Sequence, residues 1–425
     1  MTNYGYKGTA VGAKLYVNNA QVLSAKDAVA PLRCTRMAGR TSQDRSVLST
    51  PENSLISLST STSKTVSYKN KGVSGVRATN VLGDVVVGGT LPGRDESTPL
   101  VTIKGLETVA NAFHTKDGFG HEESFAAPEF DIDVSVLIDN GVPIPKELNT
   151  LLDAIEDAGG QLTTAVVDVL ANVPAPIEIP NLGSIGLGIQ KGHANKRGAE
   201  SDVKALELKV TATGEDQVLQ LGHARAVISG PAKGGVFRST SMPLDAKIAD
   251  GLLHFGGVRP RTIPCAGTNG KVKNKHLNSA SVLLPRDMIV GATDIDYSYM
   301  GEQLGKNRAK GVNASSIGAV SIKSLDLKIE GIASKVITKS KTNRKGKTVI
   351  RSVPRFSIAT ITFEGNNIAI PTPGKPVTID GLGILESRIV EGNRWGKRVT
   401  ALRVTLTDYS AVLDLGISAS QIFAY

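Results

Sequence analysis

The sequence is poor in cysteines, which cross-link small folds and ligate metals, and in aromatic residues, which fill many protein cores. Among 425 residues it has two cysteines, one tryptophan and an aromatic content of only 4%. Two cysteines exclude both a disulfide-stapled scaffold and a cysteine-ligated metal cluster. Cys34 and Cys265 lie far apart in the chain. One disulfide could join them, but we expect two buried structural thiols at equivalent positions of a repeat.

Long apolar runs are also missing. No window approaches the roughly 20 apolar residues that a membrane helix needs, so we expect no membrane span. The first residues, MTNYGYKGTAVGAKLYV, show no charged start followed by an apolar core. We therefore expect no signal peptide in this chain.

Signatures of catalysis are not found either. The six histidines are scattered without an H-E-x-x-H or other metal-ligand spacing. No G-x-S-x-G nucleophile elbow occurs. We therefore predict a protein that is not an enzyme and binds no cofactor.

The residues that are abundant favour β-structure. Hydrophobic residues make up 40% of the chain, enough to form real cores, and 45 glycines separate many short β-branched runs. This composition is typical of an all-β protein with many turns. A length of 425 residues suits two domains of about 200 residues each.

One stretch of the chain occurs twice. Residues 203–229 read VKALELKVTATGEDQVLQLGHARAVIS, and residues 399–422 read VTALRVTLTDYSAVLDLGISASQI. Apolar and polar residues alternate in both, as in strands with one buried face, and each stretch predicts a β-hairpin that closes a domain. The expected core residues are Leu206, Leu208 and Val210 in the first hairpin, and Leu402, Val404 and Leu406 in the second. We predict two tandem β-sandwich or barrel-like domains, residues 1–230 and 231–425, with a boundary near Gly230–Gly235.

Shorter matches extend the repeat. Lys71-Gly72-Val73 matches Lys310-Gly311-Val312, and Phe130-Asp131-Ile132 matches Phe356-Ser357-Ile358. Asn140-Gly141 and Gly365-Asn366-Asn367 predict hairpin turns after the second pair. The segment SVLSTPENSLISLSTSTSKTVSY predicts strands whose hydroxyl groups lie on the solvent face.

The first repeat contains an insertion near residues 145–175. Leu148, Leu151, Leu152 and Ile155 have helical spacing, Gly159-Gly160 ends that helix, and a second apolar run continues to Val173. We expect a helical hairpin that covers a sheet edge or barrel end, in preference to a partner-binding element.

Taken in order, these segments resemble the choice-of-anchor P domains of actinobacterial surface proteins. The order is a Gly-rich alternating start, a lone cysteine in a PLRCT or IPCAGTNG context, and a Ser/Thr-rich strand region. An Ile-x-Gly-Leu strand and a closing L-x-L-G-H-A hairpin follow. The resemblance implies an exposed, non-enzymatic β-rich protein. The chain shows neither a signal peptide nor a sorting motif, so we expect no cell-wall anchor. Similar modules on phage particles need no signal peptide.

Two aspartate pairs are candidate metal ligands. Alternation along a strand would place both carboxylates of Asp131-Ile132-Asp133, and both of Asp294-Ile295-Asp296, on one face. A hard cation such as Ca²⁺ could bridge such a pair. Solvent-facing strand carboxylates are the commoner arrangement, so Asp131, Asp133, Asp294 and Asp296 are kept only as candidates and no metal site is predicted.

Charge is divided unevenly along the chain. Residues 231–425 hold 28 Lys+Arg and 14 Asp+Glu, a net of +14. The chain totals of 49 and 39 leave 21 and 25 for residues 1–230, a net of −4. The segment 335–355 has eight basic residues and no acidic one: Lys335, Lys339, Lys341, Arg344, Lys345, Lys347, Arg351 and Arg355. Its centre predicts the tip of a hairpin.

Three interpretations of this basic segment stay open: a solvated surface, phosphate contacts to nucleic acid, and contact with an acidic neighbour. Interleaved aromatics and recognised motifs are missing, so sequence-specific nucleic-acid binding is not expected. We predict a non-enzymatic structural protein that assembles with copies of itself and with other structural proteins of the same assembly. A phage particle (virion) or a bacterial surface layer or filament would be its extracellular setting. The alternative is a monomeric secreted adhesin or carbohydrate-binding module.

Overall fold

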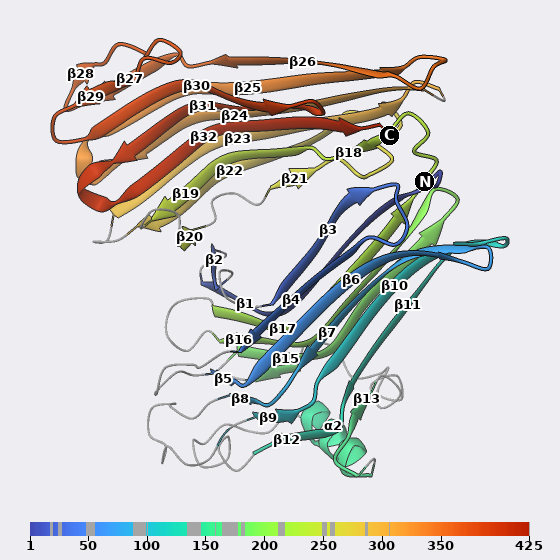
Figure 1. The fold of residues 1–425 in the computed structure, drawn as a ribbon. Helices are drawn as coiled ribbons and strands as arrows, with labels where there is room; N and C mark the ends of the chain where they lie inside the picture. Colours follow the sequence, from blue (N-terminus) through green and yellow to red (C-terminus); the bar gives the residue numbers. More distant parts are fainter. Residues whose placement is uncertain are drawn as a thin grey trace. The chain divides into compact units, whose positions relative to one another are not determined.

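Figure 1 shows the computed structural model of the chain. It describes residues 1–17, 20–23, 28–47, 56–87, 99, 101–133, 146–157, 159–163, 177–179, 183–210, 217–248, 253–255, 260–284, 288–305 and 307–424. The chain divides by its internal contacts into two compact units. Unit 1 comprises Met1, Tyr6–Arg33 and Met37–Ile228, and unit 2 comprises Thr2–Gly5, Cys34–Arg36 and Ser229–Tyr425. None of the helices in the described ranges is long and apolar enough to cross a membrane.

Unit 1 is built from antiparallel strands, as the alternating sequence predicts. Its first sheet, in the order β14-β15-β16-β17-β1-β2 with β3 paired to β1, contains β14 (Ile177–Ile179), β15 (Gly183–Asn195), β16 (Gly198–Val210), β17 (Gln217–Ser229), β1 (Gly5–Val17), β2 (Ala20–Leu23) and β3 (Val29–Thr35). Its second sheet, in the order β13-β11-β10-β7-β6-β4, contains β13 (Leu162–Thr163), β11 (Gly118–Ala127), β10 (Glu107–Thr115), β7 (Val73–Leu82), β6 (Thr60–Asn70) and β4 (Thr41–Val47). A smaller sheet contains β12 (Glu129–Ile132), β9 (Val101–Lys104), β8 (Val85–Val87) and β5 (Ile56–Leu58). Because β10 and β11 pack against β16, the two large sheets form a sandwich.

The Ser/Thr-rich strand β6 has its hydroxyl groups inside the sandwich, so the prediction of a solvent-facing arrangement is wrong. The side chains of Ser61, Ser63, Thr65 and Ser67 are fully buried. Ser63 and Thr65 each donate a hydrogen bond of 2.7 Å to a backbone carbonyl, those of Ala28 and Ala30. A Cβ atom at Gly12 of β1 would lie 2.1 Å from the Ser61 hydroxyl oxygen. The sheets therefore approach so closely here that only small side chains fit, and carbonyl partners satisfy the buried hydroxyls.

The helix predicted in the first unit is confirmed as α2 (Lys146–Asp157). Ile155 is buried, and Gly159 and Gly160 follow the helix with φ values of 69° and 77°. The Gly160 N–H donates to the Ile155 carbonyl at 2.8 Å, which is a glycine-based helix end. The predicted second apolar run, to Val173, lies outside the described residues beyond β13.

Unit 2 has two large antiparallel sheets. The first, in the order β20-β19-β32-β31-β30-β29 with β18 on β32 and β21 on β19, contains β20 (Leu253–Phe255), β19 (Thr240–Ile248), β32 (Ala411–Phe423), β31 (Gly396–Leu406), β30 (Gly383–Asn393), β29 (Val377–Ile379), β18 (Val236–Phe237) and β21 (Arg261–Thr262). The second, in the order β22-β23-β24-β25-β27-β28 with β26 on β25, contains β22 (Lys273–Leu284), β23 (Met288–Gln303), β24 (Arg308–Ile322), β25 (Leu327–Thr342), β27 (Thr360–Phe363), β28 (Asn366–Asn367) and β26 (Thr348–Ser357). Short 3-10 turns, η1 (Lys323–Leu325) and η2 (Thr407–Tyr409), join strands within each sheet. Strands β24 and β25 pack against β32, which again makes a sandwich.

The strands of the two units follow the same order. The series β2-β1-β17-β16-β15-β14 of unit 1 corresponds to β20-β19-β32-β31-β30-β29 of unit 2, and β4-β6-β7-β10-β11 corresponds to β22-β23-β24-β25-β26. Irregularities recur at matching places: Gly188 and Arg388 have φ values of 56° and 50°, and Gly222 and Gly416 have values of 59° and 62°. A duplicated module would produce this correspondence.

The predicted match between Phe130 and Phe356 is wrong in register. Gly105 and Gly331 occupy matching bulges, with φ values of 67° and 62°. In each unit, the residue three positions after this glycine pairs across the ladder with a phenylalanine, which is Phe125 in unit 1 and Phe356 in unit 2. Phe130 instead lies on the following strand, β12. A short sequence match carries no information on ladder register, which the pairing sets.

The match between Lys71-Gly72 and Lys310-Gly311 is also wrong. Lys71 and Gly72 form the turn between β6 and β7 with φ values of 43° and 84°. Lys310 and Gly311 instead lie inside β24. The turn predicted at Gly365 is confirmed between β27 and β28, where its φ is 73°. Asn140-Gly141 lies outside the described residues.

The closing hairpins lie where the alternation placed them, on β16–β17 and β31–β32. Leu402, Val404 and Leu406 are fully buried, and Leu206 is 1% exposed. Leu208 is only half-buried, which the prediction missed, and the Val210 side chain is outside the described residues. The alternating pattern therefore identified the buried face of β31 correctly.

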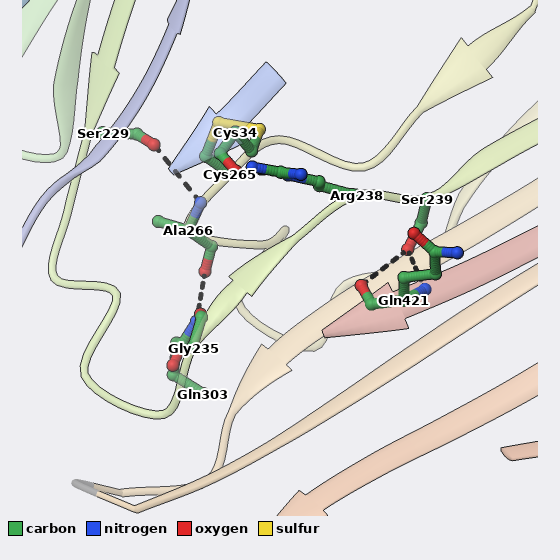
Figure 2. The surroundings of a disulfide bond; sticks show 9 residues. All are labelled: Cys34, Ser229, Gly235, Arg238, Ser239, Cys265, Ala266, Gln303 and Gln421. Atoms are coloured by element: carbon green, nitrogen blue, oxygen red, sulfur yellow. Dashed lines mark hydrogen bonds between the residues drawn. A yellow bond between two sulfur atoms is a disulfide. The ribbon is translucent and has the colours of Figure 1, made fainter. Parts of the chain in front are cut away.

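Figure 2 shows a disulfide between Cys34 and Cys265 within unit 2, so the prediction of two free thiols is wrong. Their Cα atoms are 5.4 Å apart and 231 residues separate them in sequence. Arg238 donates a hydrogen bond of 2.6 Å from Nε to the Cys34 carbonyl. Both cysteines pack in one apolar cluster with Val236 and Phe423. The disulfide thus fastens the early residues 34–36 into unit 2.

Candidate interaction surface

Basic residues that are distant in sequence line up on one face of the second sheet of unit 2. Cross-strand pairing places Lys335 opposite Arg355 and Lys339 opposite Arg351. Residues opposite each other on antiparallel strands point to the same face, and all four side chains are exposed. The alternate residues of β25, including Ser334 and Thr338, are buried against the other sheet.

Two further cations belong to this face, although they lie outside the basic segment 335–355. On β24, Arg308 lies opposite Lys341 and Lys310 lies opposite Lys339. We call the resulting set the basic face: Arg308, Lys310, Lys335, Lys339, Lys341, Arg351 and Arg355. The spacing of Arg308 and Lys310 two residues apart was the available signal, but only the ladder register shows which cations they join.

An apolar row interrupts the basic face. Val312, Ile337 and Val353 lie opposite one another on the three strands, and Val353 is 50% exposed. Rows two residues apart along a strand are separated by about 6.8 Å. Cations therefore flank an apolar strip on both sides, a composition suited to contact with a protein surface.

The remaining predicted cations lie in the turn that joins β25 to β26. Asn343 closes this turn: its N–H donates to the Lys347 carbonyl at 2.9 Å, and its Oδ1 accepts from the Lys347 N–H at 2.9 Å. Arg344, Lys345 and Lys347 are exposed. The predicted hairpin tip is thus confirmed, and its three cations extend the charge beyond the end of the basic face.

The cations of the basic face form no ion pair in the part of the chain that the structure describes. None of the seven forms an ion pair with a described carboxylate. Glu302 of β23 lies opposite Lys310 in the ladder but makes no ion pair with it. Directly opposed like charges destabilise a sheet, so this arrangement is unfavourable for the isolated fold.

Unit 1 offers an internal comparison for the same positions. Counted from the matching bulges at Gly105 and Gly331, the residues that correspond to Lys335, Lys339, Arg351, Arg355 and Lys310 are Val109, Phe113, Gly120, Ser124 and Gly75. None of these five residues is charged. The fold can therefore be built without cations at these positions.

Strand β26 forms one margin of the basic face. It pairs with β25 on one side and with no described strand on the other. Pro354 lies within β26 and has no N–H to offer a further strand. Proline on an exposed edge disfavours edge-to-edge pairing, so we expect partners to meet the face rather than extend the sheet.

A polar cluster in unit 1 contains a half-buried histidine. His223 Nε2 lies 3.0 Å from Asp202 Oδ1, and His223 Nδ1 lies 2.6 Å from Lys14 Nζ. Burial lowers the pKa of His223, as does the charge of Lys14, against the opposing effect of Asp202. Burial would raise the pKa of Asp202, but its hydrogen bond with His223 and the nearby cations outweigh burial and lower it. Both ring nitrogens are engaged, so neither is open to a metal or substrate.

Unit 2 contains an ion pair between a half-buried arginine and a buried aspartate on the sheet β19–β32–β31. Arg403 Nε lies 2.6 Å from Asp414 Oδ1, and the Asp414 side chain is fully buried. Lys247 Nζ and an Arg398 guanidinium nitrogen lie 3.3 and 3.9 Å from Asp414 Oδ2. Burial would raise the pKa of Asp414, but the hydrogen bond and charge of Arg403, with Lys247, outweigh burial and hold it below its usual value. The cations around Asp414 thus compensate its buried negative charge, and we interpret the cluster as structural.

The candidate metal ligands do not form a cation site in the described residues. No group of three or more His, Cys, Asp or Glu residues there is placed to hold a metal ion. Asp294 has a φ of 50°, so simple alternation with Asp296 fails at this bulge. Asp296 is 2.9 Å from His276, and this hydrogen bond raises the pKa of the histidine. On β12, Asp131 is exposed and Asp133 follows the end of the strand.

Comparison with known proteins adds no assignment to this surface, and the resemblance to choice-of-anchor P domains stays a prediction. No family model matches the chain, and no curated protein or solved structure shows significant similarity to it.

Proposed function

We propose that the chain is a non-enzymatic structural protein, an exposed module that assembles with copies of itself through the basic face. The observation that carries the proposal is the set of seven cations side by side with no described carboxylate paired to them. A negative surface covering the face would turn this unfavourable arrangement into a favourable one. The chain has a source of such a surface, because residues 1–230 carry 25 acidic and 21 basic residues, a net of −4.

The disulfide supports an extracellular setting. Disulfides form and persist in oxidising surroundings, such as cell and virion surfaces, and are rare in the cytosol. Cys34 and Cys265 are 5% and 2% exposed, so reductants would reach the bond poorly. A virion or a bacterial surface layer or filament would provide these surroundings.

The alternative, a monomeric adhesin or carbohydrate-binding module, gains no support from the one tryptophan. Trp395 stacks on Phe423 with ring centroids 5.0 Å apart, and the Arg394 guanidinium carbon lies 4.5 Å from the centroid of the Trp395 ring. The Trp395 ring is therefore in contact with other side chains of the protein and does not offer an uncovered ring face on which a sugar could stack.

Reversal of four cations on the basic face should abolish assembly. The variant combines Lys335→Glu, Lys339→Glu, Arg351→Glu and Arg355→Glu, all at exposed positions. Exposed pairs contribute about 0–1 kcal/mol each, so four reversed together should weaken association by two to three orders of magnitude. Light scattering at low and high salt measures the effect, since salt screens exposed charges.

A charge-matched control distinguishes an effect of this surface on assembly from an effect of the net charge of the protein. Lys271, Lys273, Lys275 and Lys375 are exposed elsewhere in unit 2, and their reversal to Glu changes net charge equally. This control should still assemble. Assembly that is indifferent to both variants and to salt would mean that the basic face is not the contact. Native protein that stays monomeric while it binds an anionic polysaccharide would favour the adhesin.

A further inference from the structure

We propose that the basic face of one copy binds the acidic end of α2 in the next copy, which makes assembly head-to-tail. This inference rests on the proposed function and names the surface that the basic face contacts. We call the acidic end the four exposed carboxylates Asp131, Asp153, Glu156 and Asp157. All four belong to unit 1, whereas the basic face belongs to unit 2.

Local structure brings these carboxylates together. Near the C-terminal end of α2, Asp153 lies one helical turn before both Glu156 and Asp157 and is a surface neighbour of each. The Phe130 N–H of β12 donates at 2.9 Å to the carbonyl of Gly160, in the turn after α2, so the strand that contains Asp131 is joined to this turn. Figure 1 shows α2 and β12 together in unit 1.

The position of these carboxylates is unfavourable for the helix itself. The C-terminal end of a helix carries a partial negative charge, which favours cations and disfavours Asp and Glu. The last turn of α2 has no basic residue. No ion pair joins the four carboxylates to another described residue, whereas Glu129 nearby is paired with Lys104 at 2.5 Å. Helix stability therefore does not explain why these residues are acidic.

The basic face and the acidic end thus have opposite charge, and each has an unfavourable arrangement of like charges in the isolated chain. The basic face opposes like charges across strands, and the acidic end places like charges at the wrong helix terminus. Each arrangement is unfavourable alone, and both become favourable when one covers the other between copies. A contact between different surfaces of identical chains that is not reciprocated within one pair is heterologous, and it generates closed rings or open filaments.

The test is a charge swap between two variants. The first is the four-fold reversal of the basic face, which changes the charge of these seven positions from +7 to −1 while the acidic end stays negative. The second combines Asp153→Lys, Glu156→Lys and Asp157→Lys and then has two positive surfaces. The half-assembly concentration should rise by about two to three orders of magnitude for the face variant and by at least about tenfold for the α2 variant, since several exposed pairs become repulsive. An equimolar mixture should assemble again, because each variant complements the other.

A matched control and a stability measurement make the result specific. Glu107, Asp117 and Glu122 are exposed carboxylates elsewhere in unit 1, and their reversal to Lys should leave assembly unchanged. The α2 variant should unfold at the same temperature as the native protein or slightly higher, because the new cations suit the helix end. Native assembly that the face reversal abolishes, but the α2 reversal leaves intact, would overturn this inference and keep the proposed function. Failure of native protein to assemble at all would overturn both.

Discussion

Replacement of the two cysteines by serine should lower the free energy of unfolding of unit 2 by about 5 kcal/mol. A bridge between residues 231 positions apart removes much chain entropy from the unfolded state, and the loop-closure relation gives about this value. The figure is an upper value, since a unit 1 that stays folded while unit 2 unfolds shortens the effective loop. Denaturant unfolding of the oxidised native protein and of the double variant measures the difference.

The same change should release the early residues held in unit 2. The Thr2 N–H donates to the Arg36 carbonyl at 3.0 Å, and the Ala232 N–H donates to the Asn3 carbonyl at 2.8 Å. Hydrogen exchange at these amides should accelerate in the variant, while amides of β31 keep their protection. Native protein treated with reductant is the control and should match the variant. Equal exchange in oxidised and reduced protein would show that the bond does not hold these residues.

Replacement of Arg403 by methionine should cost about 3 kcal/mol of folding free energy. Removing one partner of a buried ion pair leaves the other charge buried, which is more costly than losing the pair as a whole. Asp414 is fully buried, but Lys247 at 3.3 Å and Arg398 at 3.9 Å remain as partial partners, so the cost should fall at the lower end of the usual range. Urea unfolding at neutral pH provides the measurement.

A double variant tests the cause of that loss. Arg403→Met combined with Asp414→Leu removes both charges and should recover most of the stability, because a well-packed apolar pair often replaces a buried ion pair without loss. The two substitutions share one contact, so their effects should not add. If the loss of folding free energy in the double variant equals the sum of the losses in the two single variants, the interaction between the two side chains is not what stabilises this part of the sheet.

The pH dependence follows from the lowered pKa of Asp414. A carboxyl whose pKa is lower in the folded state contributes stability above its unfolded pKa, near 3.9, and loses it as the pH falls through the folded value. The native protein should therefore lose this contribution only below about pH 4. In Arg403→Met the pKa of Asp414 should rise, so the stability difference between native and variant should shrink as acid protonates the carboxyl.

The sequence by itself determined the features that depend on local pattern. Alternation identified the strands and the buried face of β31, where Leu402, Val404 and Leu406 are fully buried. Helical spacing followed by two glycines located α2. The run of cations around Asn343 predicted a hairpin. These features succeed because side-chain period and turn chemistry are properties of neighbouring residues.

Only the tertiary structure decided which distant residues share a surface. Lys310 joined Lys339 and Arg351 through the ladder register of three strands, and Cys34 met Cys265 across 231 residues. Ser63 turned inward because the sheets lie close together there and a carbonyl accepts its hydroxyl. Serine and threonine side chains can lie on the buried or on the solvent face of a strand, so their alternation does not show which face is buried. Pairing between strands that are distant in sequence sets the ladder register and the spacing of the sheets, so no short stretch of the sequence determines either of them.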